Sequence, residues 1–231
     1  MKRLAYFLVS FGLFGAGAIW GKIIPGENFF KVANVHDLFD IFGAAATCMA
    51  VVVAAFGLRT WRYQTRASTD HDLATKFLVA LRRYQDEMVR SWHYAESSVA
   101  QIDACTWIGS PGKTNFLVGL YEGRLKYTQA ARAQVEAMAV ECAEMWDDEI
   151  RDLLLVVYVT DDLIASFIET YVQLLIKGTL DEQSDHNSTV TLKRWIELSE
   201  AGVVDHQSAQ TYIGEKFSPL RQRVRRKLIN S

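Results

Sequence analysis

Charged side chains are almost absent from two stretches near the start of this 231-residue chain. The stretches are Leu4 to Ile24 and Leu38 to Leu58, and their few charges, Lys22 and Asp40, lie close to an end. A helix needs about 20 apolar residues to cross a hydrocarbon core of about 30 Å. Because lipid offers the backbone no hydrogen-bond partner, two such runs predict two spanning helices packed as a hairpin.

The first run also fits a cleaved signal peptide, since basic residues precede it and small residues lie near its end. Its length favours a retained span. Basic residues flank the outer ends of both runs: Lys2 and Arg3 before the first, and three arginines after the second. This distribution favours a multi-pass membrane protein with the N- and C-termini in the cytoplasm.

The chain is also poor in residues that build disulfide frameworks, metal sites and β-hairpins. It has 3 Cys, 5 His and 3 Pro, and the Cys and His residues lack ligand spacing. The segment GSPGKTN at 109–115 lacks the first glycine of a phosphate-binding loop, because Trp107 occupies that position. We therefore expect no enzyme activity, no cofactor, no metal and no small-molecule substrate. A net charge of -2 argues against a free nucleic-acid binder.

The rest of the chain predicts an all-α fold. We expect a transmembrane hairpin over 1–58 and, over 59–231, a cytosolic antiparallel helical bundle that begins with a long juxtamembrane helix. Residues on one face of that helix recur every three or four positions: Leu73, Phe77, Leu81, Tyr84, Met88, Trp92, Ala95, Val99 and Ile102. The polar stretch 68–70 could mark a break or a new N-cap in this helix.

Further helices are predicted after the Gly-Pro-Gly break at 109–112. The second, from about 114 to 146, has a buried face that we expect to include Leu117, Leu120, Thr128, Ala131, Val135, Met138, Cys142 and Met145. The third runs from about 148 to 177 and ends at Gly178, a suitable C′ residue. Asp161 and Asp162 at its middle argue against a third span. Together with the acidic residues at 147–152 they could bind a cation, but solvation and the favourable placement of acids at a helix N-terminus account for them better. A loop over 179–189 and helices over about 191–201 and 208–229 complete the prediction.

Small residues line both apolar runs and predict close helix packing. Gly17 and Gly21 form a GxxxG pair, and the second run carries alanines four apart, at Ala46, Ala50 and Ala54. Small residues on one face let two backbones approach closely in lipid. The contact can be the one within the hairpin, or it can join separate chains into a homo-oligomer.

Two further groups of residues are candidate contacts with the membrane or a partner. Trp61, Arg62 and Gln64 follow the second run, where an aromatic and a basic residue suit the headgroup level. The tail is rich in cations that fit a solvated helix end, contact with anionic membrane lipid, or docking of nucleic acid or an acidic partner: Arg221, Arg223, Arg225, Arg226 and Lys227.

The segment Thr60-Trp61-Arg62-Tyr63-Gln64, followed by Leu73-Ala74 and a long helix to Arg90, resembles a group of small bacterial membrane proteins. These have two N-terminal spans and a helical cytosolic domain, and they include the two-span transmembrane effectors of retron anti-phage systems. The resemblance implies a toxic effector of abortive infection. It also implies an inhibitory partner, the reverse transcriptase with its RNA-DNA product.

The residues are compatible with such an effector. Two spans cannot line an aqueous pore, so several hairpins would have to cluster to disrupt the bilayer. The near-absence of charge in the spans argues against a transporter. The alternative is a non-toxic membrane-anchored scaffold or sensor, whose helical domain docks a cytosolic partner and whose hairpin is only a tether.

Overall fold

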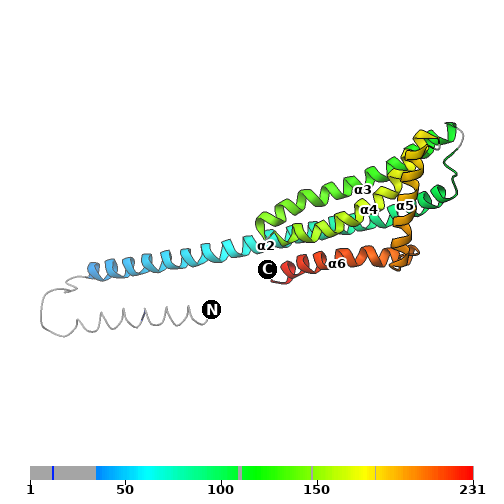
Figure 1. Ribbon diagram of the computed structural model, residues 1–231. Helices are drawn as coiled ribbons and strands as arrows, with labels where there is room; N and C mark the ends of the chain where they lie inside the picture. The colour runs from blue at the N-terminus through cyan, green and yellow to red at the C-terminus, as the bar shows by residue number, and fades with distance from the viewer. Residues whose placement is uncertain (1–11, 13–34, 109–110, 147, 180, 231) are drawn as a thin grey trace. The chain divides into compact units, whose positions relative to one another are not determined.

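A computed structural model describes residue 12 and residues 35–108, 111–146, 148–179 and 181–230, and these residues form helices and short connections without a strand. The chain divides into two compact units, Met1–Tyr63 and Gln64–Ser231. The first predicted span, with Gly17 and Gly21, lies outside the described residues except for residue 12. The helices formed by the described residues are α2 (Val35–Asp103), α3 (Pro111–Met145), α4 (Glu149–Lys177), α5 (Glu182–Glu200) and α6 (His206–Asn230) (Figure 1).

Helix α2 contains the second predicted span and continues without a break at 68–70. Its apolar beginning and its amphipathic remainder are therefore parts of one helix. In the unit Gln64–Ser231, all nine residues predicted for its inner face are buried, from Leu73 to Ile102. Figure 1 shows α3, α4 and α6 alongside this part of α2, with α5 crossing near one end.

An early position of α3 contacts a late position of α2, and the residue that follows the end of α3 contacts an earlier position of α2. The Tyr121 hydroxyl lies 3.0 Å from Ser97 Oγ. At the opposite end of α3, Trp146 Nε1 donates to Asp70 Oδ1 at 3.0 Å.

Helix α6 likewise contacts a late position of α2 near its own start and an earlier position of α2 further along. The His206 ring stacks on His93 with centroids 4.3 Å apart, and Arg221 Nη1 donates to Gln85 Oε1 at 2.8 Å. Phe217 lies between His206 and Arg221 on α6 and packs edge-on against Tyr84 of α2, with ring centroids 5.6 Å apart. The last helix therefore covers a flank of the core.

The helix ends explain where the sequence prediction was correct and where it was wrong. Gly178 ends α4 with φ 63 and donates its N–H to the Leu174 carbonyl, which confirms its predicted role. The predicted loop over 179–189 is wrong, because α5 already begins at Glu182. The side chain of Asp181 accepts a hydrogen bond from the Ser184 N–H at 2.7 Å and caps the new helix.

The buried face predicted for α3 also needs one correction. Leu120 is 42% exposed, and Tyr121 is buried in its place. The Tyr121 ring packs edge-on against Tyr94 and Tyr171, with centroid distances of 5.4 and 5.0 Å. Tyr121 is four residues after Leu117, so it continues the same helical stripe as well as Leu120 does, and the aromatic contacts decide between them.

Candidate functional site

The apolar part of α2 is the most distinctive surface of the unit Met1–Tyr63. Within the described residues, α2 is one helix long and apolar enough to cross a membrane, and its most apolar window has no buried residue. Large side chains such as Phe42, Val51 and Phe56 are 55%, 64% and 46% exposed. Exposed apolar surface of this extent needs lipid or another helix to cover it.

The predicted association residues of this run lie along one face of α2. Ala46, Ala50 and Ala54 are exposed. A Cβ added at Gly43 or Gly57 would meet nothing within 4 Å. These five small residues leave a shallow strip on the helix, open to a second backbone. The predicted exit residues Trp61, Arg62 and Gln64 follow on α2 and are also exposed.

A buried polar network at the centre of the unit Gln64–Ser231 was missed by the sequence analysis. Tyr84 of α2 donates its hydroxyl to Asp161 Oδ2 of α4 at 2.7 Å. Arg132 of α3 lies 3.4 Å from the same oxygen and 2.5 Å from Asp162 Oδ1. The Arg132 guanidinium also covers the Tyr158 ring at 4.3 Å. Three helices are thus held together by one carboxylate, one hydroxyl and one guanidinium.

Burial controls the protonation of this network. Asp161 is only 5% exposed, and its burial raises the pKa of the carboxyl, although the Tyr84 hydrogen bond and Arg132 act in the opposite direction. Burial, followed by the charge and hydrogen bond of Asp161, raises the pKa of Tyr84 far above its usual range. The hydroxyl therefore remains a donor at neutral pH. The Tyr84–Asp161 hydrogen bond at its centre is buried and can fix helix register, whereas the Asp162 side chain at its edge is exposed.

A second polar contact joins α2 to α3. Arg124 is 8% exposed and pairs through Nη2 with Glu87. Beside it, the hydroxyls of Ser91 and Thr128 lie 2.7 Å apart. Arg124, Ser91 and Thr128 are buried, and their contacts can fix the register of the two helices.

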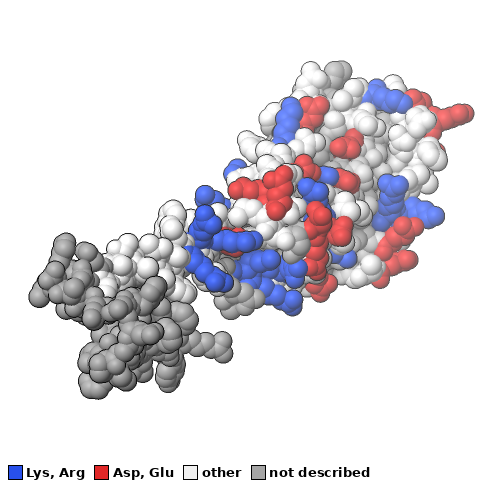
Figure 2. Space-filling view, turned by 90° about the vertical axis from the view of Figure 1, so that its left-hand side faces the viewer, with Lys and Arg blue, Asp and Glu red and all other residues white. Residues whose placement is uncertain are grey.

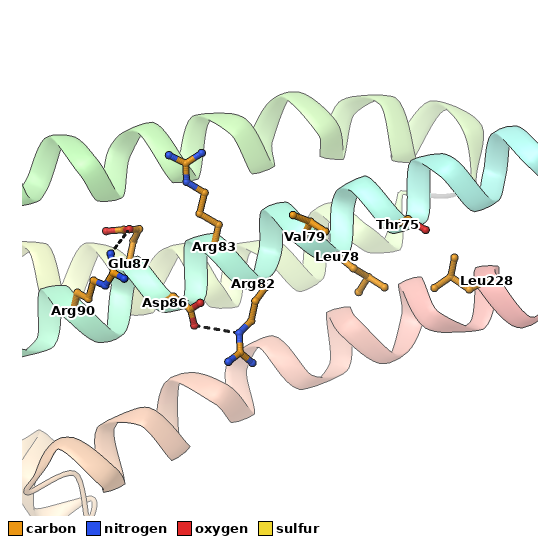
Figure 3. A pocket seen from close by; sticks show the side chains of 9 residues that line it. All are labelled: Thr75, Leu78, Val79, Arg82, Arg83, Asp86, Glu87, Arg90 and Leu228. Carbon is orange, nitrogen blue, oxygen red and sulfur yellow. Dashed lines mark hydrogen bonds and ion pairs between the residues drawn. The ribbon is translucent and has the colours of Figure 1, made fainter.

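An open groove runs along the outer face of α2, beside the end of α6 (Figure 3). Its volume is about 520 Å³. Leu78, Val79 and Leu228 supply apolar lining, and the guanidinium groups of Arg82 and Arg90 lie along the same face. The whole lining consists of Thr75, Leu78, Val79, Arg82, Arg83, Asp86, Glu87, Arg90 and Leu228.

The predicted basic tail lies on α6, and its members have different surroundings. Arg221 bonds to Gln85 and to the Gly214 carbonyl, Arg223 lies 2.8 Å from Glu149 Oε2, and Lys227 covers the Trp146 ring at 5.7 Å. Arg225 and Arg226 are exposed.

The surface charge of the helical unit is mixed in sign. Burial, and then the nearby guanidinium groups of Arg225 and Arg82, lower the pKa of Arg221. On the face drawn in Figure 2, basic side chains gather in one area and acidic side chains lie beside them. This pattern suits contact with one complementary surface better than attraction to any polyanion.

Comparison with protein-family models, curated proteins and solved structures gives no match.

Proposed function

We propose that this chain is an integral protein of the bacterial inner membrane, with a hairpin of spans at about 4–24 and 38–58 and both termini in the cytoplasm. In this proposal the remaining helices form a cytosolic antiparallel bundle. The pairing of Ser97 with Tyr121 and of Asp70 with Trp146 supports opposite directions for α2 and α3. The exposed apolar run of α2 supports insertion into lipid.

We further propose that the protein is a toxic effector of a retron-type anti-phage system that acts by abortive infection. Its hairpins associate through Gly17, Gly21 and the alanine face of α2, and the resulting homo-oligomer disrupts the membrane. A reverse transcriptase with its RNA-DNA product holds the effector inactive until infection. The resemblance of the 60–90 segment motivates this partner.

One observation carries the proposal. A single helix, α2, contains both the exposed apolar run with its small-residue strip and the inner face of the helical core. A partner that changes the packing of α2 against α3, α4 or α6 acts on the same helix that enters the membrane. In this proposal, a cytosolic inhibitor that binds the helical domain acts on the span through α2, because both belong to the same helix.

The test is uptake of a membrane-impermeant dye by bacteria after tightly controlled induction of the full chain. Native protein should admit dye, and Gly17→Leu and Gly21→Leu should reduce entry, because bulky residues keep the backbones apart. Val51→Leu, a conservative change on the exposed surface of the span, serves as the matched control and should leave entry unchanged. Entry that survives both glycine changes would remove the association mechanism.

The open groove on α2 favours a second candidate, a membrane-anchored scaffold or sensor that docks a cytosolic partner. Exchanging the hairpin for an unrelated two-span anchor separates the two functions. A scaffold keeps its function after the exchange, whereas an effector loses toxicity. The dye-uptake assay is then repeated during phage infection, in cells that also carry the genes adjacent to this one in its genome. Continued absence of dye entry under these conditions would favour the scaffold.

A further inference from the structure

The groove on α2 lies on the side of that helix that faces away from α4. Tyr84 points toward α4, because its hydroxyl bonds to Asp161. Successive residues of an α-helix are rotated by about 100°, so Arg82, two residues earlier, points about 200° away from Tyr84. Val79 lies on the same outer side and is 66% exposed. In Figure 3, α3 and α6 flank this side of α2 and leave it open.

Helix α4 has an exposed apolar face on its own outer side. Leu155, Val156 and Val159 are 59%, 50% and 69% exposed. Val159 precedes Asp161 by two residues, so it points about 200° away from the carboxylate that contacts α2. Two acidic side chains flank this face: Asp152 is exposed, and the Asp162 side chain is 65% exposed and pairs with Arg132. The basic side chain of Arg151, which is 55% exposed, lies at the same edge as Asp162.

The two faces lie on opposite sides of the α2 and α4 pair and at the same height along it. The hydrogen bond between Tyr84 and Asp161 shows that these two residues lie at the same height along the helix pair. Val79 precedes Tyr84 by five residues and Val156 precedes Asp161 by five, which places both about 7.5 Å below that level. The direction is shared, because Asp70 meets Trp146, just before α4 begins, while Tyr84 meets Asp161.

We propose that the α2 groove of one chain receives the outer face of α4 from a second copy of the same chain. Leu155, Val156 and Val159 cover the apolar floor of the groove, while Asp152 and Asp162 meet its arginines. Because one copy offers its groove and the next its α4 face, the contact is heterologous and can extend from chain to chain.

This inference rests on the anchoring part of the proposed function. Copies inserted in one membrane in the same orientation are related by rotation about the membrane normal. Within the helical unit, the two faces lie at the same height and their helices run in the same direction, so two copies placed side by side can bring one face against the other. The contact would join helical domains and would add to any association between spans.

The chemistry of the groove favours this occupant over nucleic acid. Its floor is apolar and has no aromatic ring on which a base could stack. Two of its arginines already have acidic partners within α2, Asp86 at 3.2 Å from Arg82 and Glu87 at 3.1 Å from Arg90. Exposed ion pairs of this kind contribute little, so they can exchange for acids on an arriving apolar face.

The test is cysteine cross-linking of the full chain in bacterial membranes. Cys48 and Cys105, which are both exposed, are first changed to Ala and Ser. Two differently tagged copies are then expressed together, one with Val79→Cys and the other with Val159→Cys. A short bismaleimide should join the unlike pair as the main product, and copies that both have Val79→Cys should remain unlinked.

Charge reversal gives the second measurement. Arg82→Glu on the first copy should abolish the mixed product, and Asp152→Lys on the second copy should restore it. Arg194→Glu, on the exposed surface of α5, is the matched control and should leave the product unchanged. Loss with Arg82→Glu but without restoration would overturn the predicted pairing.

Three other results would also overturn the inference: no linkage of the unlike pair, linkage of like pairs as the main product, or protection of Val79→Cys from maleimide labelling without linkage to a second copy. The last result would assign the groove to another partner, and added nuclease or high salt would show whether that partner is nucleic acid. Dye entry is measured separately. Cross-linking without toxicity would reject the effector and keep the contact.

Discussion

Asp161 is a carboxylate inside a helical core, so its protonation is linked to the stability of the helical unit. Burial raises the pKa of Asp161 in the folded state above its ordinary value. The folded state therefore binds this proton up to a higher pH than the unfolded state does. The stabilising contribution of this group is complete below the ordinary pKa and is lost as the pH rises through the folded-state pKa.

We predict that Asp161→Asn raises the thermal midpoint at neutral pH and weakens the loss of stability between an acidic pH, near the ordinary pKa of an aspartate, and neutral pH. An amide removes the buried charge and still accepts the Tyr84 hydrogen bond. Arg132 keeps its contacts with Asp162 and Glu136. Circular dichroism melts of the full chain in detergent at the two pH values measure the effect.

Asp161→Leu is the control, because it leaves the Tyr84 hydroxyl buried without an acceptor. That loss should cost about 1 to 3 kcal/mol of unfolding free energy. If Asn lowers the midpoint as much as Leu does, the carboxylate itself stabilises the fold and the prediction is wrong.

At the scale of the element, glycine is required at the end of α4 but not in the interior of α3. Gly178 ends α4 in the left-handed region, with φ 63. Gly178→Ala should lower the unfolding free energy by about 1 kcal/mol, because a Cβ disfavours that conformation. Denaturant titration of the full chain in detergent measures the change.

Gly123, inside α3, is the matched comparison. A Cβ there would meet nothing within 4 Å, and alanine is favoured over glycine in a helix interior by about 0.5 to 1 kcal/mol. Gly123→Ala should therefore stabilise the protein. Equal effects at the two glycines would show that the conformation of Gly178 is not what requires glycine there.

Long periodic helices could be predicted from the sequence, and α2 is the clearest case. All nine of its predicted inner residues are buried, because an uninterrupted stripe leaves one face available for a core. The beginning of α5 could not be predicted in the same way. Its first half is polar, and it is helical because Asp181 caps it and Thr191 bonds to Thr170 of α4 at 3.2 Å. Such tertiary contacts are not visible in a periodic pattern.

The two candidate sites, the buried network and the α2 groove, also differ in whether they could be predicted from the sequence. Asp161 could have been recognised, since it follows Leu154 and Val157 and precedes Ile164 on one buried stripe. Its charge instead led to an expectation of solvation. The α2 groove could not have been found, because it depends on which side of α2 the other helices leave uncovered. The two spans, their association and the toxic activity remain predictions.

At the scale of the whole molecule, the exposed apolar run of α2 should determine where the protein is found. We predict that native protein stays in the membrane fraction after extraction with alkaline carbonate. The double variant Val51→Asp, Val53→Asp weakens one of the two proposed spans, so a larger share of it than of the native protein should be extracted. Each acidic residue costs about 2.5 to 3.5 kcal/mol at the centre of a span. Immunoblots of the pellet and the supernatant measure the distribution.

Val204→Asp is the control for that experiment. Val51 and Val204 are both 64% exposed, and Val204 belongs to the helical unit. The control should therefore remain in the pellet with the native protein. If the control and the double variant are extracted alike, exposure of apolar side chains in general, and not the run in α2, holds the protein on the membrane.

Among the described helices, α2 comes first in the chain and α6, which covers a flank of it, comes last. Gln85 and Arg221 are separated by 136 residues, so the ribosome needs about 7 to 27 s to make the second partner after the first, at about 5 to 20 residues per second. During that interval the flank of α2 that Phe217 will cover stays open. A newly made chain therefore passes through a stage in which the apolar run of α2 is complete while the helical unit still lacks its last helix. Chaperones and any inhibitory partner encounter this unfinished form first.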